Sequence, residues 1–257
     1  MITAESVTKR FGKLDAVKDA SFSLKVDEIV GFVGPNGAGK STMLKMLATF
    51  FHPTSGQLLV DGIDPVKDPL AVRRRIGYLP GDTPLYQEMR VDRFLEFIAK
   101  TRGLRGKRLQ ERLNWVVENC GVLPALAKKV KECSTGFRKR IGLAAALVHD
   151  PQIILLDEPT HGLDPLQVLA FRDLLRALRP GRSILLSSHV ISEVAAICDR
   201  VLMIHEGKLL AEGTLKELCQ KEGLQEEDLE GLFIRLVGKD SSGATTSGAK
   251  EAPNGNG

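Results

Sequence analysis

A glycine-rich segment, Gly34–Thr42, constrains the fold of this chain more than any other part of its sequence. It reads GPNGAGKST and fits the pattern G-x-x-x-x-G-K-[ST]. The run EIVGFVG before it, Glu28–Gly34, is almost continuously apolar, as a strand buried on both faces should be. From Lys40 onward, apolar residues recur at helical spacing. A strand, a glycine-rich turn and a helix in this order predict an α/β fold with a phosphate-binding loop.

The residue types in this loop suit the triphosphate of ATP. Gly37 and Gly39 carry no Cβ, so the chain can take positive φ and bring its N–H groups close to phosphate oxygens. Lys40 then reaches the β- and γ-phosphates, and Ser41 offers a hydroxyl to Mg²⁺. The alternative is a glycine-rich turn without a ligand, which the flanking strand and helix disfavour. We therefore expect ATP and Mg²⁺ as ligands, with the nucleotide held by Gly34, Pro35, Asn36, Gly37, Ala38, Gly39, Lys40, Ser41 and Thr42.

Short apolar runs later in the chain complete a predicted sheet. Ile153–Asp157, Ser183–Ser188 and Arg200–His205 have strand length, and segments with helical periodicity separate them. Strands that alternate with helices predict a mainly parallel, right-handed wound sheet. Residues 83–150 contain three helical segments, which we interpret as a helical subdomain inserted into the α/β core.

The carboxylates of Asp157 and Glu158 end one of these runs. Ligands bind at the carboxyl edge of a parallel sheet, so both side chains are expected there. Asp157 is placed to share Mg²⁺ with Ser41, and Glu158 to polarise an attacking water. An Asp-Glu-Pro sequence that only ends a strand is the structural alternative. The phosphate loop earlier in the chain favours ATP hydrolysis instead.

The rest of the sequence indicates the extent of the domain and argues against a membrane span and a zinc site. We expect one ATPase domain over residues 1–237 and a disordered tail over 238–257, where apolar residues are scarce. No stretch approaches the roughly 18–20 apolar residues of a membrane span. The four cysteines form no C-x-x-C pair, which argues against a zinc site.

Basic residues are spread along the chain, whose formal net charge is +4. Three short clusters stand out, at Arg73–Arg75, Arg102–Arg108 and Lys128–Lys131. Solvated helix faces are the ordinary explanation for such clusters. A patch that faces nucleic acid or lipid is the alternative.

Several further motifs make the sequence resemble the ATP-binding subunits of ABC transporters, over about residues 2–237. CSTGF at Cys133–Phe137 is similar to the family's signature segment, Leu-Ser-Gly-Gly-Gln. GLDP at Gly162–Pro165 is similar to its dimer-contact loop, and SSH at Ser187–His189 to the segment with its switch histidine. Asp157 with Glu158 matches the metal-binding Asp and the catalytic Glu. The resemblance implies a P-loop NTPase core with a mainly parallel sheet, an N-terminal antiparallel β subdomain and an inserted helical subdomain.

The resemblance also implies roles for single residues. Within one subunit, Phe11 would stack on adenine in place of the usual Tyr. Glu158, His189 and Lys40 would act in catalysis.

Other roles lie between subunits. Ser134 and Gly136 would close the ATP site of an opposing subunit, because the signature segment does not touch its own subunit's nucleotide. Asp164 would be the key residue of the dimer-contact loop. These assignments follow from the resemblance alone.

The sequence departs from the family after IGYLP, where a Gln that touches Mg²⁺ is usual. Gly81 stands at that position, and Asp82 follows as a candidate metal ligand. The change resembles bacterial ABC-2-type exporter ATPases, whose permease is a separate polypeptide. Phe137 replaces the Gln of the signature segment, and Asp27 stands where Gly is frequent. Asp tolerates positive φ better than most residues, so the turn at Asp27 should survive.

The implied function is ATP hydrolysis coupled to transmembrane transport, as part of an exporter. Two subunits, expected to be a homodimer, would meet head to tail around two ATP molecules. They would drive an integral membrane permease from the cytoplasmic face of the cell membrane, as a peripheral subunit. We expect the segment Gly81–Phe97 to contact this permease, and we expect no nucleic-acid partner.

Two other functions remain alternatives. A soluble ABC ATPase that acts on nucleic acid or ribosomes usually has two cassettes or a long coiled-coil insertion, and this chain has neither. A regulatory cassette that binds ATP without turnover is supported only by Gly81. The presence of Asp157, Glu158 and His189 argues against it.

Overall fold

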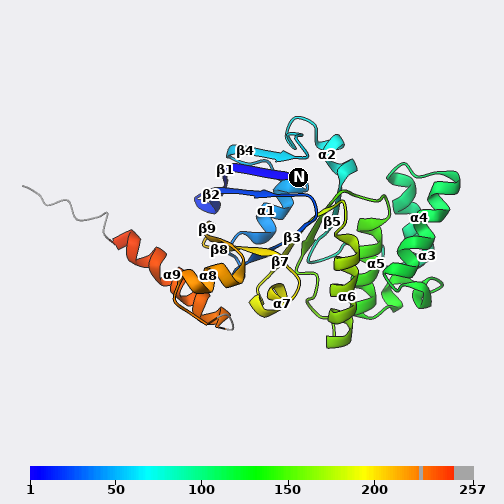
Figure 1. Ribbon diagram of the computed structural model, residues 1–257. Coiled ribbons are helices and arrows are strands. Elements are labelled where there is room, and N and C mark those ends of the chain that lie inside the picture. Colours follow the sequence, from blue (N-terminus) through cyan, green and yellow to red (C-terminus); the bar gives the residue numbers. More distant parts are fainter. Residues whose placement is uncertain (226–227, 246–257) are drawn as a thin grey trace, which may run out of the picture.

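Two β-sheets and surrounding helices make up the computed structural model, which describes residues 1–225 and 228–245 (Figure 1). The strands are β1 (Ile2–Phe11), β2 (Leu14–Leu24), β3 (Glu28–Val33), β4 (Ser55–Val60), β5 (Ile76–Leu79), β6 (Ile153–Asp157), β7 (Ser183–Ser188), β8 (Arg200–His205) and β9 (Lys208–Gly213). The α-helices are α1 (Lys40–Leu47), α2 (Pro69–Arg75), α3 (Val91–Thr101), α4 (Gly106–Asn119), α5 (Thr135–Leu147), α6 (Pro165–Leu178), α7 (Ile191–Ala195), α8 (Leu215–Lys221) and α9 (Leu229–Thr245). Two short 3₁₀ turns, η1 (Leu123–Ala125) and η2 (Val130–Glu132), lie between α4 and α5.

The larger sheet has six strands in the order β5-β6-β7-β3-β8-β9. All pairs are parallel except β8 with β9, so the prediction of a mainly parallel sheet is confirmed. Successive side chains of a strand point to opposite faces. In β6, Ile153 and Leu155 enter one apolar core, and Ile154 and Leu156 enter the other. Both faces are therefore covered, which explains why this strand reads as a continuous apolar run.

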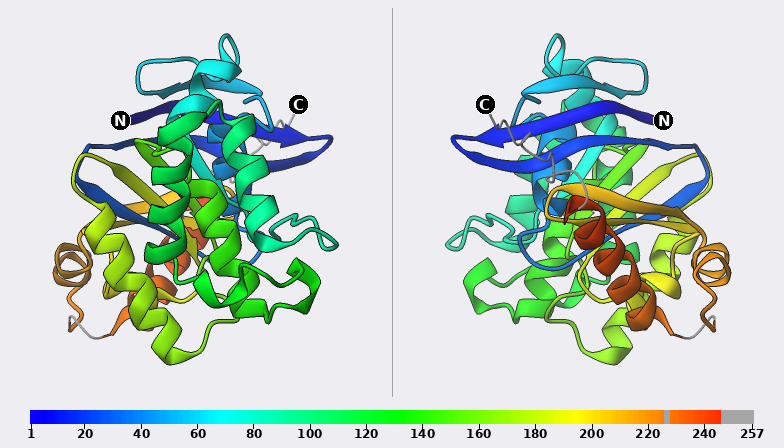
Figure 2. Two further views of the ribbon diagram at one scale, coloured as in Figure 1. Left: turned by 90° about the vertical axis from the view of Figure 1, so that its right-hand side faces the viewer. Right: turned by 90° about the vertical axis from the view of Figure 1, so that its left-hand side faces the viewer.

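The smaller sheet is antiparallel and has the order β2-β1-β4 (Figure 2). Its inward side chains, among them Ile2 and Leu24, share a core with Met43 and Leu47 of α1 and with one face of the larger sheet. This packing fixes α1 from both sides. Because α1 begins at the end of the phosphate loop, the same packing fixes the loop.

Helices α3, α4 and α5 form the helical subdomain, shown in green at one end of the molecule in Figure 1. They belong to the predicted insertion, residues 83–150, and pack mainly on one another through buried residues such as Phe94, Leu95 and Val116. The C-terminal end of this insertion is tied to the sheet, because His149 Nε2 lies 2.9 Å from the carbonyl oxygen of Ile76. Within the described residues, no helix is long and apolar enough to cross a membrane.

The expected disordered tail needs a correction at its start. We predicted disorder from residue 238, but α9 continues through Thr245, so residues 238–245 are helical. Leu232 in this helix is fully buried, which anchors its first turns. Adding residues to an existing helix costs little compared with nucleating one. The rest of the predicted tail, residues 246–257, lies outside the described residues.

The buried imidazole of His149 makes the fold sensitive to acid. Burial and the nearby Arg102 guanidinium lower the pKa of His149 to about 4. An unfolded chain binds this proton with an ordinary pKa near 6.5, so stability is lost as pH falls below about 6.5. Between pH 7 and pH 5 the loss from this one residue is about 2 kcal/mol. The free energy of unfolding, measured with urea, should decline less between pH 7 and pH 5 for the His149→Gln variant than for the wild-type chain. Equal declines for both chains would contradict this account.

Candidate active site

The phosphate loop takes the backbone path that its glycines predict. Gly37 and Gly39 have φ values of 81° and 109°. A Cβ on Gly39 would lie 2.3 Å from the carbonyl oxygen of Ala16, a distance that no side chain tolerates. The requirement for glycine is therefore both conformational and steric at this position. Asp27 likewise has φ 61°, which confirms the expected left-handed turn before β3.

Lys40 is buried at the start of α1, with only 5% of the residue exposed. Its Nζ donates to the carbonyl oxygens of Gly34 and Pro35 at 2.6 and 3.0 Å. Glu158 Oε1 lies 3.5 Å away. Burial lowers the pKa of Lys40, and the carboxylates of Glu158 and Asp157 oppose that effect. The ammonium group is thus held in the loop by two carbonyl oxygens beside the Glu158 carboxylate, and a phosphate can replace the carbonyl contacts.

Asp157 occupies the predicted carboxyl edge of the sheet and is 3% exposed. Its Oδ1 accepts hydrogen bonds from Ser41 Oγ at 2.9 Å and from Ser187 Oγ at 2.6 Å. Within the described residues, no group of three or more His, Cys, Asp or Glu side chains is placed to hold a metal ion. The hydroxyl of Ser41 and the carboxylate of Asp157 fit Mg²⁺, which prefers oxygen ligands and commonly shares its shell with phosphates and water.

Glu158 has an unusual backbone conformation, with φ 47°. A non-glycine residue in this left-handed region is strained, and such strain clusters at functional sites. Its Oε2 lies 2.8 Å from His189 Nδ1, and its other oxygen faces Lys40. The Ser187 hydroxyl also accepts a hydrogen bond from the Glu158 N–H at 3.0 Å. The carboxylate is therefore held from two sides at the mouth of the loop.

Two adjoining cavities collect most of the predicted site residues. The first, of about 600 Å³, is lined by the loop residues Asn36–Thr42, by Phe11 and by Glu158. The second, of about 490 Å³, is lined by Asp82, Asp157, Glu158 and His189, and shares Asn36, Ser41 and Glu158 with the first. Phe11 is 42% exposed, with its ring edge-to-face with Phe51 and Lys9 Nζ 4.9 Å from its ring centroid. Asp82 lies in the same cavity as Asp157.

Five predicted site residues line neither cavity. Gly34 and Pro35 belong to the phosphate loop, where their carbonyl oxygens accept from Lys40, and the other three are Ser134, Gly136 and Asp164. Ser134 is the exposed N-cap of α5 and accepts from the Phe137 N–H at 3.3 Å. Asp164 caps α6 in the same way. Gly136 packs inward, because a Cβ there would lie 2.4 Å from Gln167 Oε1 of α6. The small residue at Gly136 thus lets the start of α5 lie close to α6, the helix that Asp164 caps.

Lys139 is a residue of this site that the sequence did not reveal. It lies on α5, yet its Nζ reaches the core and donates to the carbonyl oxygens of Gly81 and Glu158 at 2.8 and 3.2 Å. It lines the cavity of Asp157 and His189. Burial lowers the pKa of Lys139 below its ordinary value, although the carboxylates of Asp157, Asp82 and Glu158 oppose this effect. Its place among the basic residues after the signature segment gave no sign of this contact.

Gly81 lies beside Asp157, where the family usually has Gln. A Cβ on Gly81 would lie 3.7 Å from the Asp157 carbonyl oxygen and 3.8 Å from its Oδ2, both ordinary contacts. Space therefore exists for a side chain that points at the metal-binding Asp. With no side chain at this position, the Gly81 carbonyl oxygen accepts a hydrogen bond from Lys139 Nζ.

Comparison with known proteins agrees with this geometry. The family model described as "ABC transporter" matches residues 17–161, more than half of the chain. The ABC transporter ATP-binding protein NatA of Bacillus subtilis is 39% identical over 240 residues, which cover 91% of this chain and 97% of NatA. The chain belongs to the ABC transporter family, as an ATP-binding subunit. It is an ATPase whose hydrolysis of ATP serves transport.

Two other relatives of this ABC ATP-binding subunit have names that refer to bacitracin transport and to a multidrug transporter. The bacitracin transport ATP-binding protein BcrA of Bacillus licheniformis is 36% identical, over 82% of this chain and 69% of BcrA. The probable multidrug ABC transporter ATP-binding protein YbhF of Escherichia coli is 36% identical over 92% of this chain, which spans 42% of YbhF.

Solved structures show the same fold. A structure described as the ATP binding subunit of an ABC transporter has a TM-score of 0.85, with 26% identity, and covers 92% of this chain and 99% of that one. A dimeric post-hydrolysis state of the cassette MJ0796 with ADP and Pi has a TM-score of 0.76, with 26% identity, over 83% of this chain and 98% of that one. These likenesses support ATP and ADP as ligands of this subunit.

The Lys139 contacts predict a selective loss of turnover. Lys139→Met removes two hydrogen bonds made by a charged donor, so Gly81 and Glu158 lose a common anchor. Such bonds are worth about 1.5–3 kcal/mol each, so kcat should fall roughly tenfold or more while KM for ATP changes little. Lys139→Arg keeps the charge and the donors and should restore much of the rate. Steady-state ATPase assays test this, and equal rates for all three chains would rule out a positioning role.

Proposed function

We propose that this ATP-binding subunit acts as one half of a head-to-tail dimer that encloses two ATP molecules and drives a separate membrane permease. The observation that carries the proposal is the separation of Ser134 and Asp164 from the chain's own cavities. Each chain has one phosphate loop and one signature segment. A complete site then takes its loop from one subunit and its signature segment from the other.

The chemistry of a signature helix supports this arrangement. α5 begins with an N-cap hydroxyl and free helical N–H groups, which suit an anion such as a γ-phosphate. Beside it, Leu166 at the start of α6 is 78% exposed. An exposed large apolar residue next to Asp164 is expected where a second subunit covers the surface. The dimeric state of the MJ0796 cassette is consistent with the same geometry.

Within one site, the residues divide the work of hydrolysis. Lys40 exchanges its carbonyl contacts for phosphate oxygens, and the loop N–H groups surround the β-phosphate. Glu158 orients a water molecule for in-line attack, and His189 fixes the position of the Glu158 carboxylate. Ser41 and Asp157 would hold Mg²⁺, with Asp82 as a further oxygen donor. When bound, Mg²⁺ supplies positive charge beside the phosphate oxygens.

The pairing of Glu158 with His189 favours this function over a cassette that binds ATP without turnover. A carboxylate at 2.8 Å from an imidazole and next to the loop lysine is already in position for catalysis. Loss of the γ-phosphate would remove contacts from both subunits and let the dimer open.

A groove between the core and the helical subdomain is the proposed contact for the permease. Of the residues in Gly81–Phe97 that we expected to form it, Leu85 and Phe94 line a cavity of about 250 Å³ together with Phe50. Tyr86 is 55% exposed and Phe97 is 42% exposed. Their rings lie 5.7 Å apart, in edge-to-face geometry. An exposed aromatic surface beside an apolar groove suits a short amphipathic segment of a membrane protein.

The exporter assignment rests on relatives. BcrA and YbhF are named for transport of bacitracin and for multidrug transport. A cassette with a TM-score of 0.77, cbiO1 of Clostridium perfringens, is described as part of an ABC transporter complex. We infer that this subunit binds a permease at the cytoplasmic face of the cell membrane and supports outward transport.

Glu158→Gln should separate ATP binding from hydrolysis. The amide keeps the shape of the side chain but cannot accept a proton from water, so ATP stays bound between the subunits. Size-exclusion chromatography with ATP should show a stable dimer for this variant and not for the wild-type chain after hydrolysis. Undiminished phosphate release by the variant would refute the catalytic role of Glu158.

Lys40→Ala tests the loop itself. The variant loses the buried ammonium group of the phosphate loop, so calorimetry should detect no ATP binding at concentrations that saturate the wild-type chain. Circular dichroism checks that the variant is folded. Retained ATP affinity would show that the loop holds the nucleotide without this lysine.

A further inference from the structure

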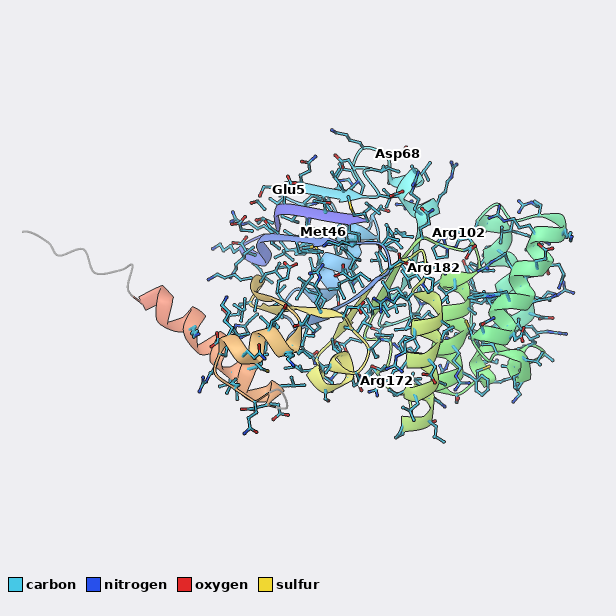
Figure 3. All side chains as sticks on the ribbon, viewed as in Figure 1. Glu5, Met46, Asp68, Arg102, Arg172 and Arg182 are labelled. Atoms are coloured by element: carbon cyan, nitrogen blue, oxygen red, sulfur yellow. The ribbon has the colours of Figure 1, made fainter. Side chains whose placement is uncertain are left out.

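Two basic clusters that lie apart in the sequence, Arg73–Arg75 and Arg102–Arg108, meet in the folded chain. Figure 3 labels Arg102 at the junction of α2 with the helical subdomain, and its Nη1 donates to the Arg73 carbonyl oxygen at 2.6 Å. A cavity of about 780 Å³ opens there. We name it the arginine pocket after the arginines that line it, Arg73, Arg74, Arg102, Arg105 and Arg108. His149 also lines it, and no carboxylate does.

The arginine pocket differs from the rest of the described chain in its charge balance. Elsewhere, arginines are mostly paired with carboxylates, as in Arg10, Arg75, Arg90, Arg93, Arg112, Arg176, Arg179, Arg182 and Arg200. None of the five arginines of the pocket forms such a pair within residues 1–225 and 228–245. The cluster is therefore a local concentration of uncompensated positive charge.

Neutral acceptors hold these side chains in place. Arg73 Nε donates to Thr49 Oγ1 at 2.6 Å, and Arg105 Nη1 donates to the carbonyl oxygens of Lys100 and Leu104, each at 2.7 Å. The carbonyls of Arg73 and Lys100 belong to the last turns of α2 and α3, where the helix dipole is negative. Dipoles of this kind position a guanidinium group without cancelling its charge. In the described part of the chain, Arg74 and Arg108 make no polar contact and remain available.

The positive charges of the pocket act on one another, because burial and the charge of Arg73 lower the pKa of Arg102. The carboxylate next to the pocket, Asp150, is engaged by Arg182 at 2.8 Å and by Arg112 at 3.5 Å. Like charges gathered on one wall destabilise the empty pocket, and an anion would relieve that repulsion.

We propose that the arginine pocket binds a phosphate-bearing group. Guanidinium groups match phosphate oxygens with paired N–H donors, and several such donors around one cavity suit a multiply charged anion. The group can come from the headgroup of an anionic phospholipid or from a free polyphosphate. The pocket shares Arg73 and Arg102 with the groove proposed for the permease. The inference that the phosphate belongs to a lipid therefore rests on the proposed function, whereas the inference that the pocket binds a phosphate does not. No Phe, Tyr or Trp side chain lines the pocket to stack a base, which disfavours nucleic acid.

A charge-matched pair of variants tests this site. Arg74→Gln with Arg108→Gln removes the two unpartnered cations of the pocket. Arg93→Gln with Arg176→Gln removes two exposed arginines that pair with carboxylates of their own helices. The lipid arm measures flotation of the full chain with phosphatidylglycerol vesicles, with phosphatidylcholine vesicles as the uncharged reference. The free-phosphate arm measures pyrophosphate binding by calorimetry on a Lys40→Ala background, in which the phosphate loop is disabled. A third arm measures retention of a short RNA oligonucleotide.

The pocket variant should lose affinity about tenfold or more in the lipid arm, the free-phosphate arm or both, while the control variant retains it. Loss with vesicles alone assigns the lipid headgroup, and loss with pyrophosphate alone assigns a free phosphate. Equal losses in the two variants, no binding of either probe, or binding of RNA alone would overturn the proposal. ATP affinity and ATPase rate of the pocket variant should stay unchanged, because no residue of the pocket lines the nucleotide cavities. The experiments therefore distinguish failure of the proposed phosphate pocket from failure of the ATPase function.

Discussion

The buried carboxylate of Asp157 is the interaction on which the site depends. Two serine hydroxyls donate to the same oxygen, one from the start of α1 and one from the end of β7. Three separate segments of the chain therefore meet at one charged atom inside a nearly dry environment. A buried charge is tolerated only when it is well hydrogen-bonded, so the network holds the phosphate loop, β6 and β7 in register. Ser41, which begins the helix after the phosphate loop, and Glu158, which follows Asp157, both adjoin that junction.

The next residue shows how the fold presents a reactive group. Asp157 ends the strand inside the protein, and the left-handed backbone of Glu158 turns its carboxylate outward to Lys40 and His189. The strain of this turn is held by neighbours on two sides, Ser187 and Lys139, which contact the Glu158 main chain. The same lysine binds the carbonyl of Gly81. A cation from the helical subdomain therefore links the main chain at Gly81 to the main chain at Glu158.

Much of this could be predicted from the sequence, because local pattern decides it. The strand–loop–helix unit at Gly34–Thr42 and the apolar runs before Asp157 and His189 are short-range features, and the structure places their ends at one sheet edge. Lys139 and the arginine pocket depend on which helix faces which loop, and no single segment carries that information. The same holds for Gly136, whose small size serves a contact with Gln167. Residues 238–245 are helical because a packed turn precedes them, which composition alone does not reveal.

The helix α5 has a consequence that reaches beyond one site. Its N-cap is Ser134, which lines neither nucleotide cavity, and five residues later Lys139 lines one of them. At about 1.5 Å and 100° per residue, these two points lie roughly 7–8 Å apart along the axis and on different sides of one stiff rod. In a head-to-tail dimer, a shift of this rod caused by the opposing subunit's nucleotide would be felt at Gly81 and Glu158. ATP hydrolysis at the two sites would then be coupled, because the same helix would contact the neighbour's phosphate and the subunit's own site.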